Sequence, residues 1–271
     1  ESRKFLIYED KDSLLKEFCL CVDDRVPSKR HIIAANEGNA VALAAGYHLA
    51  SKSLPLVYMQ NSGLGNAVNP LLSLCDPDVY SIPMLVMIGW RGEPGITDEP
   101  QHVKQGKIQL ELLDTMDIPY EIISSHDDQC KDKISRLVET AKNNKRPVVL
   151  LVKKGTFETY DKDIKKMDDQ RMLREEALEI ILEHIDENTI VVSTTGKTSR
   201  EIFEIREKRN ESHQQDFLTV GSIGHCSSIA LGIALAKSDR KVVCIDGDGA
   251  LLMHLGSLTS IASLKPKNFR H

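Results

Sequence analysis

The sequence predicts an α/β protein with two doubly wound parallel sheets, one in each of two domains. Short apolar runs alternate with longer helical patterns between residues 31 and 153, and the alternation starts again at residue 174. Strands and helices that alternate in this way form βαβ units, whose strands lie parallel. A length of 271 residues is enough for two domains of moderate size.

The first half contains five strand-like apolar segments: residues 31–35, 55–60, 83–90, 119–123 and 147–153. Two further segments have apolar residues at every third or fourth position, which predicts helices at 39–52 and 130–144. Near the N-terminus, the strand-like segment 5–10 runs into the helix-like segment 11–18 without a recognisable turn.

A polar, highly charged stretch at 153–170 predicts an exposed linker, so we expect domains at residues 1–160 and 161–271. The second half is predicted to have helices at 174–185, 197–208 and 227–237, and strands at 189–193, 216–220 and 241–246. A helical run at 250–264 precedes a segment that resembles the approach to another strand. Because a doubly wound sheet normally continues past this point, we expect the native protein to have residues after His271.

Composition disfavours two classes of partner. The formal net charge is -5, and the chain has no Lys/Arg-rich run with interleaved aromatic residues, which argues against nucleic-acid binding. No apolar stretch approaches the roughly 20 residues of a membrane span, and the N-terminus lacks the apolar core of a signal peptide. We therefore expect a cytoplasmic protein whose six scattered cysteines are reduced and serve packing.

The sharpest motif is Gly247, Asp248 and Gly249, which follow an apolar strand and begin a helix. Glycines let the backbone approach an anion closely, a helix N-terminus offers N–H groups, and the carboxylate is a ligand for a divalent cation. The motif alone also fits a tight strand-to-helix turn.

Two other turns in this half have a similar composition. Gly221, Ile223 and Gly224 follow one predicted strand. A polar turn follows another, with Thr194, Thr195, Gly196, Lys197 and Ser199. Because ligands bind beyond the carboxyl ends of parallel strands, three such turns at one sheet edge favour a phosphate site over three unrelated helix caps.

In the first half, Glu37 comes directly after an apolar strand and before a helix of small residues. An ionised carboxylate buried there costs several kcal/mol unless it has a partner. The alternative is structural: Asn36 caps the helix and Glu37 stands in its first turn, where the helix dipole favours an acid.

These motifs together resemble the thiamine diphosphate enzymes, in which a pyrimidine domain is followed by a diphosphate domain. The resemblance implies that Glu37 hydrogen-bonds the aminopyrimidine ring, that Asp248 holds Mg²⁺, and that Ile223 wedges the cofactor into its folded shape. It implies a cofactor-binding role for further residues: Asn61, Ser62, Gly63, Thr195, Gly196, Ser199, Gly221, Gly224, Gly247 and Gly249. In the family, an Asn pair farther along the chain completes the metal site, and no such pair occurs before His271.

Within these enzymes, five long strings resemble the decarboxylases of phosphonopyruvate and sulfopyruvate: residues 35–50, 58–74, 88–102, 192–201 and 245–258. The resemblance implies conversion of phosphonopyruvate into phosphonoacetaldehyde and carbon dioxide, a step of phosphonate biosynthesis, with sulfopyruvate as the open alternative. At residues 9–15 the family usually has the turn Gly-Val-Pro-Asp-Ser-Leu-Leu, of which only residues 12–15 match. We therefore expect residues to be missing there.

The segment 88–107 is the least regular long stretch, and we expect it to be a loop that clamps the anionic substrate. The predicted substrate-binding residues are Arg91, Gln101, Lys104 and Lys197. His102 and His225 are candidate catalytic acids or bases because imidazole titrates near neutral pH, although a lone histidine is more often a structural hydrogen-bonding group.

The resemblance also implies at least a homodimer, since family members build each active site between the pyrimidine domain of one subunit and the diphosphate domain of another. Two other functions stay open. A non-catalytic homologue is favoured by the missing Asn pair, whereas the synthase or transketolase branch of the superfamily is disfavoured because the chain has no third domain.

Overall fold

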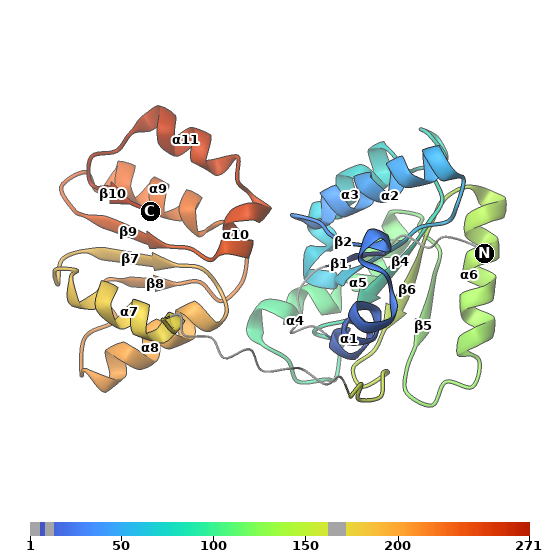
Figure 1. Cartoon of the computed structure of the whole chain (residues 1–271), viewed down its shortest axis with the longest axis horizontal. Coiled ribbons are helices and arrows are strands. Elements are labelled where there is room, and N and C mark those ends of the chain that lie inside the picture. Colours follow the sequence, from blue (N-terminus) through green and yellow to red (C-terminus); the bar gives the residue numbers. More distant parts are fainter. Residues whose placement is uncertain (1–5, 9–13, 162–171) are drawn as a thin grey trace. The chain divides into compact units, whose positions relative to one another are not determined.

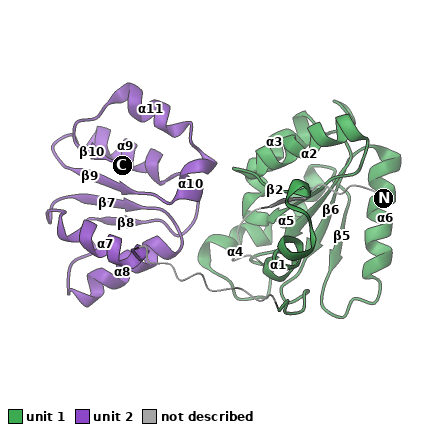
Figure 2. Cartoon of the chain, viewed as in Figure 1, with its two compact units in different colours: residues 1–164 green, residues 165–271 purple. Residues whose placement is uncertain are grey.

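The computed structural model describes residues 6–8, 14–161 and 172–271 (Figure 1). The chain forms two compact units, residues 1–164 and 165–271 (Figure 2). Residues 9–13, within the segment that departs from the family turn, and 162–171, which include most of the expected linker, lie outside the described ranges. The expected boundary between residues 160 and 161 stays a prediction.

Unit 1 is built on six parallel strands in the order β2-β1-β3-β4-β6-β5. Their bounds are β1 Leu6–Tyr8, β2 His31–Ile33, β3 Leu56–Gln60, β4 Met84–Gly89, β5 Tyr120–Ile123 and β6 Pro147–Val152. All five predicted strands of this half are confirmed, each somewhat shorter than expected. The α/β class with parallel sheets is confirmed as well.

Helices cover both faces of this sheet. They are α1 Lys16–Arg25, α2 Glu37–Ser51, α3 Leu64–Ser73, α4 Pro100–Lys107, α5 Gln109–Thr115 and α6 Cys130–Asn144, with 3-10 turns η1 Ser28–Arg30 and η2 Asn61–Gly63. On one face of the sheet, Val57 and Met59 of β3 pack with α2, α3 and α5. On the other face, Tyr58 of β3 packs with α1 and α6. Successive strand residues point to opposite faces, so a central strand buried on both sides is apolar throughout.

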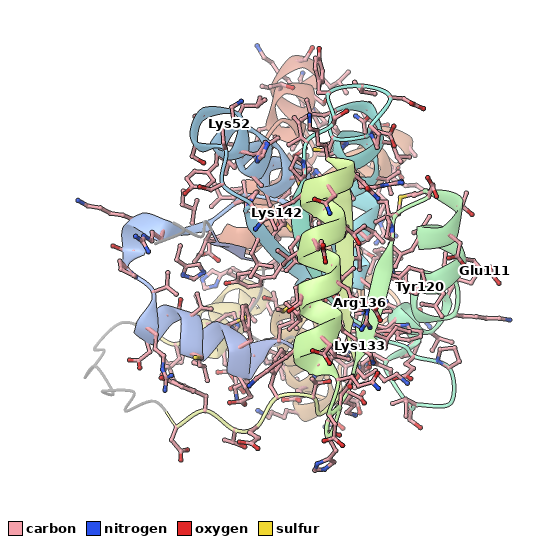
Figure 3. All side chains as sticks on the ribbon, turned by 90° about the vertical axis from the view of Figure 1, so that its right-hand side faces the viewer. Lys52, Glu111, Tyr120, Lys133, Arg136 and Lys142 are labelled. Carbon is pink, nitrogen blue, oxygen red and sulfur yellow. The ribbon has the colours of Figure 1, made fainter. Side chains whose placement is uncertain are left out.

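Helix α6 is fastened to the edge strand β5 by two basic side chains (Figure 3). Lys133 Nζ donates to the Ile122 carbonyl at 2.8 Å and to Asp127 at 2.7 Å, and Arg136 donates to Glu121 at 2.8 Å. An exposed strand edge invites pairing with other chains, and cationic side chains laid along it oppose such pairing.

Unit 2 has four parallel strands in the order β10-β9-β7-β8. Their bounds are β7 Ile190–Ser193, β8 Asp216–Leu218, β9 Val242–Ile245 and β10 Phe269–Arg270, and the helices are α7 Arg174–Glu183, α8 Lys197–Lys208, α9 Cys226–Ala236, α10 Asp248–Met253 and α11 Ser257–Leu264. Helix α9 packs on one face of the sheet around Val192, whereas α7 and α8 pack together around Ile202. The expected strand near the C-terminus is confirmed by β10.

Two expectations about local structure are wrong. Segment 88–107 is not irregular throughout, because its second half forms α4, with Pro100 in the first turn, where proline fits. The helical run at 250–264 is two helices, separated by residues 254–256. The strand predicted at 216–220 is confirmed by β8, which ends two residues earlier, at Leu218. Among the described helices, none is both long and apolar enough to cross a membrane.

Candidate cofactor site

The three polar turns of unit 2 share one edge of its sheet. Strand β7 lies between β9 and β8, and both pairings are parallel, so the three carboxyl ends point the same way. The turn at 194–196 follows β7, the turn at 219–225 follows β8, and residues 246–247 follow β9. The sheet order therefore brings together three segments that are spread over residues 194–247 of the sequence.

The central turn is organised from within by Ser199. Its hydroxyl donates to the Thr194 carbonyl at 2.7 Å and lies 2.7 Å from the Ser193 hydroxyl, and the residue is buried. Gly196 has φ +91°, a backbone conformation that an L side chain rarely adopts. Ser199 thus holds the turn in shape, while Thr195 and Gly196 are more open to solvent.

Thr194 is the residue of this turn that stands out in the structure. Its hydroxyl oxygen is buried and has no hydrogen-bond partner. Its methyl carbon lies 3.6 Å from where a Cβ on Gly247 would be, so Thr194 and the Gly247 turn are neighbours. A buried hydroxyl without a partner is costly and indicates a place where a ligand or water completes the site.

The turn after β9 presents Asp248. Gly247 has extended backbone, and its N–H donates to Asp246 Oδ1 at 2.9 Å. Asp248 follows as the first residue of α10, and its side chain is exposed. The two aspartates are therefore in different situations: Asp246 supports the turn, and Asp248 is accessible to a cation.

The turn after β8 packs against α10. A Cβ added to Gly224, at φ +86°, would lie 2.7 Å from the His254 ring and 3.0 Å from the Ala250 carbonyl oxygen, so this position requires glycine. Ile223 remains 38% exposed just before it. An exposed aliphatic side chain beside the Asp248 helix is a suitable contact for a ring system.

His225 is exposed at the start of α9. Its Nδ1 lies 3.1 Å from the Ser222 hydroxyl, and its ring centroid is 4.4 Å from that of His254. Gly221, Ser222 and His225 thus form the rim of the same turn. Lys197, predicted to bind substrate, is exposed at the first residue of α8.

In unit 1, the carboxylate of Glu37 lies in a cradle made by a glycine. The helix cap is Asn36, whose side chain accepts from the Asn39 N–H at 2.9 Å. Glu37 is only 3% exposed, and Asn66 Nδ2 donates to its Oε2 at 2.8 Å. A Cβ on Gly63 would lie 1.9 Å from Glu37 Oε1, so the carboxylate occupies the space that this glycine leaves.

Asn61 connects the ends of two neighbouring strands. Its side-chain amide donates to the Arg91 carbonyl at 2.9 Å and accepts from the Arg91 N–H at 3.0 Å. Asn61 is buried and Ser62 is exposed. Asn61 therefore anchors the 3-10 turn that contains Gly63 to the segment after β4.

Arg91 is engaged by Asp98, a residue that sequence reasoning did not single out. Arg91 Nε donates to Asp98 Oδ2 at 2.7 Å, and the Gly92 N–H donates to the same oxygen at 2.8 Å. The guanidinium hydrogen bond holds the pKa of Asp98 well below its ordinary value, although burial opposes the shift. The pair organises the 91–99 loop, so the charge of Arg91 is largely neutralised within the chain.

Helix α4 presents two half-buried polar side chains. The Oε1 of Gln101 and the Nδ1 of His102 are buried without a hydrogen-bond partner, whereas Lys104 is exposed. Burial, together with the nearby charge of Arg91, lowers the pKa of His102, which favours the neutral ring. Gln60 and Gln109 also carry buried amide atoms without a partner, and no local sequence pattern identifies them.

Two family models match the chain, one in each unit. Residues 13–118 match the thiamine pyrophosphate enzyme N-terminal TPP binding domain, and residues 194–268 match the C-terminal TPP binding domain. The sulfopyruvate decarboxylase subunit alpha of Methanothermobacter thermautotrophicus is 32% identical over 129 residues, which are 48% of this chain and 75% of that protein. The chain therefore belongs to the thiamine pyrophosphate enzyme family.

Longer alignments reach two kinds of decarboxylase. Phosphonopyruvate decarboxylase from Streptomyces viridochromogenes is 35% identical over 260 residues, covering 90% of this chain and 63% of that protein. Sulfopyruvate decarboxylase from Methanosarcina acetivorans is 30% identical over 254 residues, covering 86% and 62%. The chain thus spans less than two thirds of the length of these two relatives.

Proposed function

We propose that this chain forms the cofactor-binding part of a decarboxylase that uses thiamine diphosphate and Mg²⁺ to convert phosphonopyruvate into phosphonoacetaldehyde and carbon dioxide. The observation that carries the proposal is the buried carboxylate of Glu37, held over Gly63 by Asn66. A family enzyme needs a carboxylate at this position, and a mere helix cap does not, since Asn36 already caps α2.

The residues of unit 2 fit the diphosphate and its cation. The unpartnered Thr194 hydroxyl, the Gly247 backbone and the exposed Asp248 carboxylate lie at one sheet edge, and a carboxylate oxygen is a ligand that Mg²⁺ prefers. Asp248 would hold the metal, and backbone at Thr195, Gly196, Gly247 and Gly249 would contact the diphosphate. Ser199 supports this turn from below, and Gly221, Ile223 and Gly224 would line the thiazolium side.

When bound, thiamine diphosphate supplies a cationic ring that accepts the electron pair left as carbon dioxide departs. The contribution of this chain is to position and tune that ring. Asn66 occupies Glu37 Oε2, which leaves Oε1 to share a proton with the aminopyrimidine. Burial of the carboxylate keeps water from competing for that hydrogen bond.

For the substrate, we propose Lys104, Lys197 and Gln101 as the anion- and carbonyl-binding groups. Arg91 would act mainly by holding the loop that leads into α4, the helix of Gln101 and Lys104. Neutral His102 has a buried nitrogen able to accept a proton, and exposed His225 is the second candidate. The longest alignments support phosphonopyruvate first and sulfopyruvate as the alternative. We also propose a cytoplasmic homo-oligomer that acts in phosphonate biosynthesis, with each site between two subunits.

The test is to titrate the full-length protein with thiamine diphosphate and Mg²⁺, and then to measure carbon dioxide release from phosphonopyruvate, sulfopyruvate and pyruvate. We expect saturable cofactor binding and fastest release from phosphonopyruvate. Preference for sulfopyruvate would overturn the substrate alone. Cofactor binding without release from any of the three would indicate a non-catalytic homologue and overturn the decarboxylase.

A further inference from the structure

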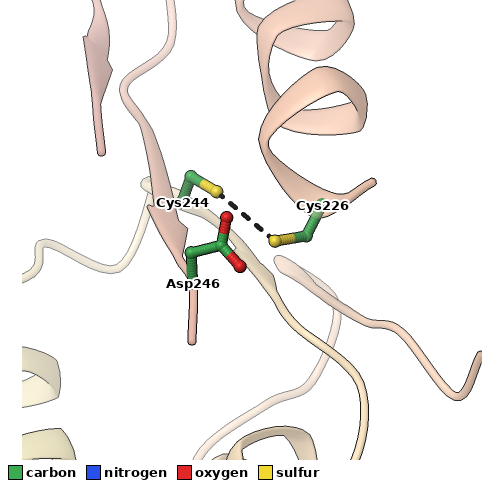
Figure 4. Close-up of side chains that lie close together, drawn as sticks. All are labelled: Cys226, Cys244 and Asp246. Atoms are coloured by element: carbon green, nitrogen blue, oxygen red, sulfur yellow. Dashed lines mark hydrogen bonds between the residues drawn. The ribbon is translucent and has the colours of Figure 1, made fainter. Parts of the chain in front are cut away.

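Two cysteines and an aspartate of unit 2 form a cluster that the proposed function does not use (Figure 4). Cys226 is the first residue of α9, Cys244 lies in β9, and Asp246 follows β9 directly. Cys244 Sγ donates a hydrogen bond to Cys226 Sγ at 3.8 Å, and the two sulfurs and a carboxylate oxygen all lie within 4.8 Å of one another. In Figure 4 the three side chains point into the same space between α9 and β9.

The spacing of the sulfurs fits a shared metal ion better than a disulfide. A disulfide needs about 2.05 Å between the sulfurs, so the two side chains would have to close most of the present gap. Two thiolates on a tetrahedral zinc, each about 2.3 Å from the ion, are separated by about 3.8 Å. The distance between the sulfurs of Cys226 and Cys244 matches this sulfur-to-sulfur separation.

The surroundings of the cluster also favour a bound cation. Cys226 is the first residue of an eleven-residue helix, so its side chain lies at the positive end of the helix dipole. Both oxygens of Asp246 have hydrogen-bond partners, the Gly247 N–H at 2.9 Å and His271 Nε2 at 3.3 Å. Carboxylates that bind metals are commonly held by such outer partners.

The three side chains of the cluster are buried, and their burial and donor atoms favour one kind of ion over another. Cys226 and Cys244 are 2% and 4% exposed, and the Asp246 side chain is 7% exposed. Thiolate sulfurs prefer soft ions such as Zn²⁺, whereas Mg²⁺ prefers oxygen ligands and retains water. Within the described ranges, this is the cluster that combines two sulfurs with a carboxylate.

We propose that Cys226, Cys244 and Asp246 bind a soft divalent cation of the Zn²⁺ type. The site is separate from the Mg²⁺ site proposed at Asp248 and does not depend on it. A bound ion would join the start of α9 to the end of β9, directly before Gly247. It would thereby brace the turn that carries Asp248.

The experiment uses Co²⁺ as a spectroscopic substitute for Zn²⁺. We would treat the protein with a chelator, titrate it with Co²⁺, and record near-ultraviolet and visible absorption. The expected result is one Co²⁺ per chain with a sulfur-to-cobalt charge-transfer band that Zn²⁺ abolishes by competition. Cys226→Ala and Cys244→Ala should each weaken Zn²⁺ binding by at least the roughly 10- to 100-fold that loss of a supporting partner costs.

Two matched variants separate this site from other cysteines and from the cofactor site. Cys75→Ala removes a fully buried thiol of unit 1 and should leave the band unchanged. Asp248→Asn should weaken Mg²⁺-dependent cofactor binding and also leave the band unchanged, so failure of one proposal is distinguishable from failure of the other. Wild-type protein that binds Co²⁺ without a sulfur band, or binds none, would overturn the site even if both cysteine variants fail to fold.

Discussion

At the residue scale, the position of Glu37 depends on a neighbour that has no side chain. Its carboxylate lies where a Cβ on Gly63 would be, and only Asn66 donates to it among the hydrogen bonds described for its side chain. The proposed role of Glu37 therefore needs three residues at once: the acid, the amide that orients it and the glycine that makes room.

Replacing Glu37 by Gln tests the acid itself. Gln is nearly the same size and retains an oxygen that can accept from Asn66, so the cradle and cofactor binding should be preserved. It cannot share an acidic proton with the aminopyrimidine, so we expect turnover to fall by about 10²- to 10⁴-fold, the usual contribution of a positioned acid or base. Steady-state rates and a cofactor titration check this. Unchanged turnover would show that Glu37 has only a structural role.

Gly63→Ala tests the cradle without touching the acid. The added methyl would lie 1.9 Å from Glu37 Oε1, so the carboxylate must move, and we expect turnover and cofactor affinity to drop together. The matched control is Gly65→Ala, two residues on, where a Cβ meets nothing within 4 Å. Circular dichroism reports whether each variant folds. Equal activity of the two alanine variants would argue against the cradle.

At the element scale, Asp98 holds the loop between β4 and α4. Its carboxylate binds the Arg91 side chain and accepts from the Gly92 and Glu99 N–H groups, and its side chain is 12% exposed. For Asp98→Asn we expect a loss of about 1–3 kcal/mol in the free energy of unfolding, since hydrogen bonds to a charged group are replaced by weaker ones. Denaturant unfolding checks this. Asp128→Asn, at an exposed position, is the control and should cost little.

A second element-scale prediction concerns pH. His31 of β2 lies between Asp23 of α1 at 3.1 Å and the Tyr58 hydroxyl of β3 at 2.7 Å. Burial lowers the pKa of His31 below its ordinary value, and Asp23 opposes this only in part. The unfolded chain then binds the proton first, so this histidine removes stability as pH falls below about 6.5.

His31→Gln should therefore flatten the decline in the free energy of unfolding between about pH 7.5 and pH 5, relative to wild type. Denaturant unfolding at several pH values measures the slope. The comparison variant His184→Gln changes an exposed histidine near the end of α7 and should leave the slope as it is. An identical slope in the His31 variant would mean that its titration is not linked to folding.

The elements themselves could largely be predicted from sequence, for a physical reason. β4 and β6 are buried on both faces, so their runs are apolar throughout, and α8 has a clear amphipathic pattern. Helix α4 was missed because Gly92, Gly95 and two prolines precede or begin it, and its start depends on a loop that Asp98 fixes. A short-range sequence pattern cannot reveal the contacts that Asp98 makes with this loop.

The site residues divide in the same way. The motifs at Glu37 and Asp248 come just after strand-like apolar runs, so their position along the sequence was enough to predict them. Other features of the site depend on how separate segments pack. They are the space that Gly63 leaves for Glu37, the pairing of Arg91 with Asp98, and the burial of the Thr194 hydroxyl. Such contacts depend on sheet order, which no local pattern specifies.

At the scale of the whole molecule, the two units differ in how much core they have. Within the described residues, unit 1 has buried apolar clusters of 20 and 12 residues, whereas those of unit 2 have 7 and 4. Because each unit has its own core and burial of apolar surface is the main stabilising contribution, the two can unfold separately. Unit 2 should be the less stable one.

The chain contains a probe that distinguishes the units, because its single tryptophan, Trp90, is buried in unit 1. In a denaturant titration, we expect Trp90 fluorescence to report only the later transition, while far-ultraviolet circular dichroism begins to change earlier as the helices of unit 2 unfold. Thiamine diphosphate with Mg²⁺ should move the early transition to higher denaturant, since a ligand stabilises the folded state that binds it. Coincident transitions by both probes would show that the units unfold as one.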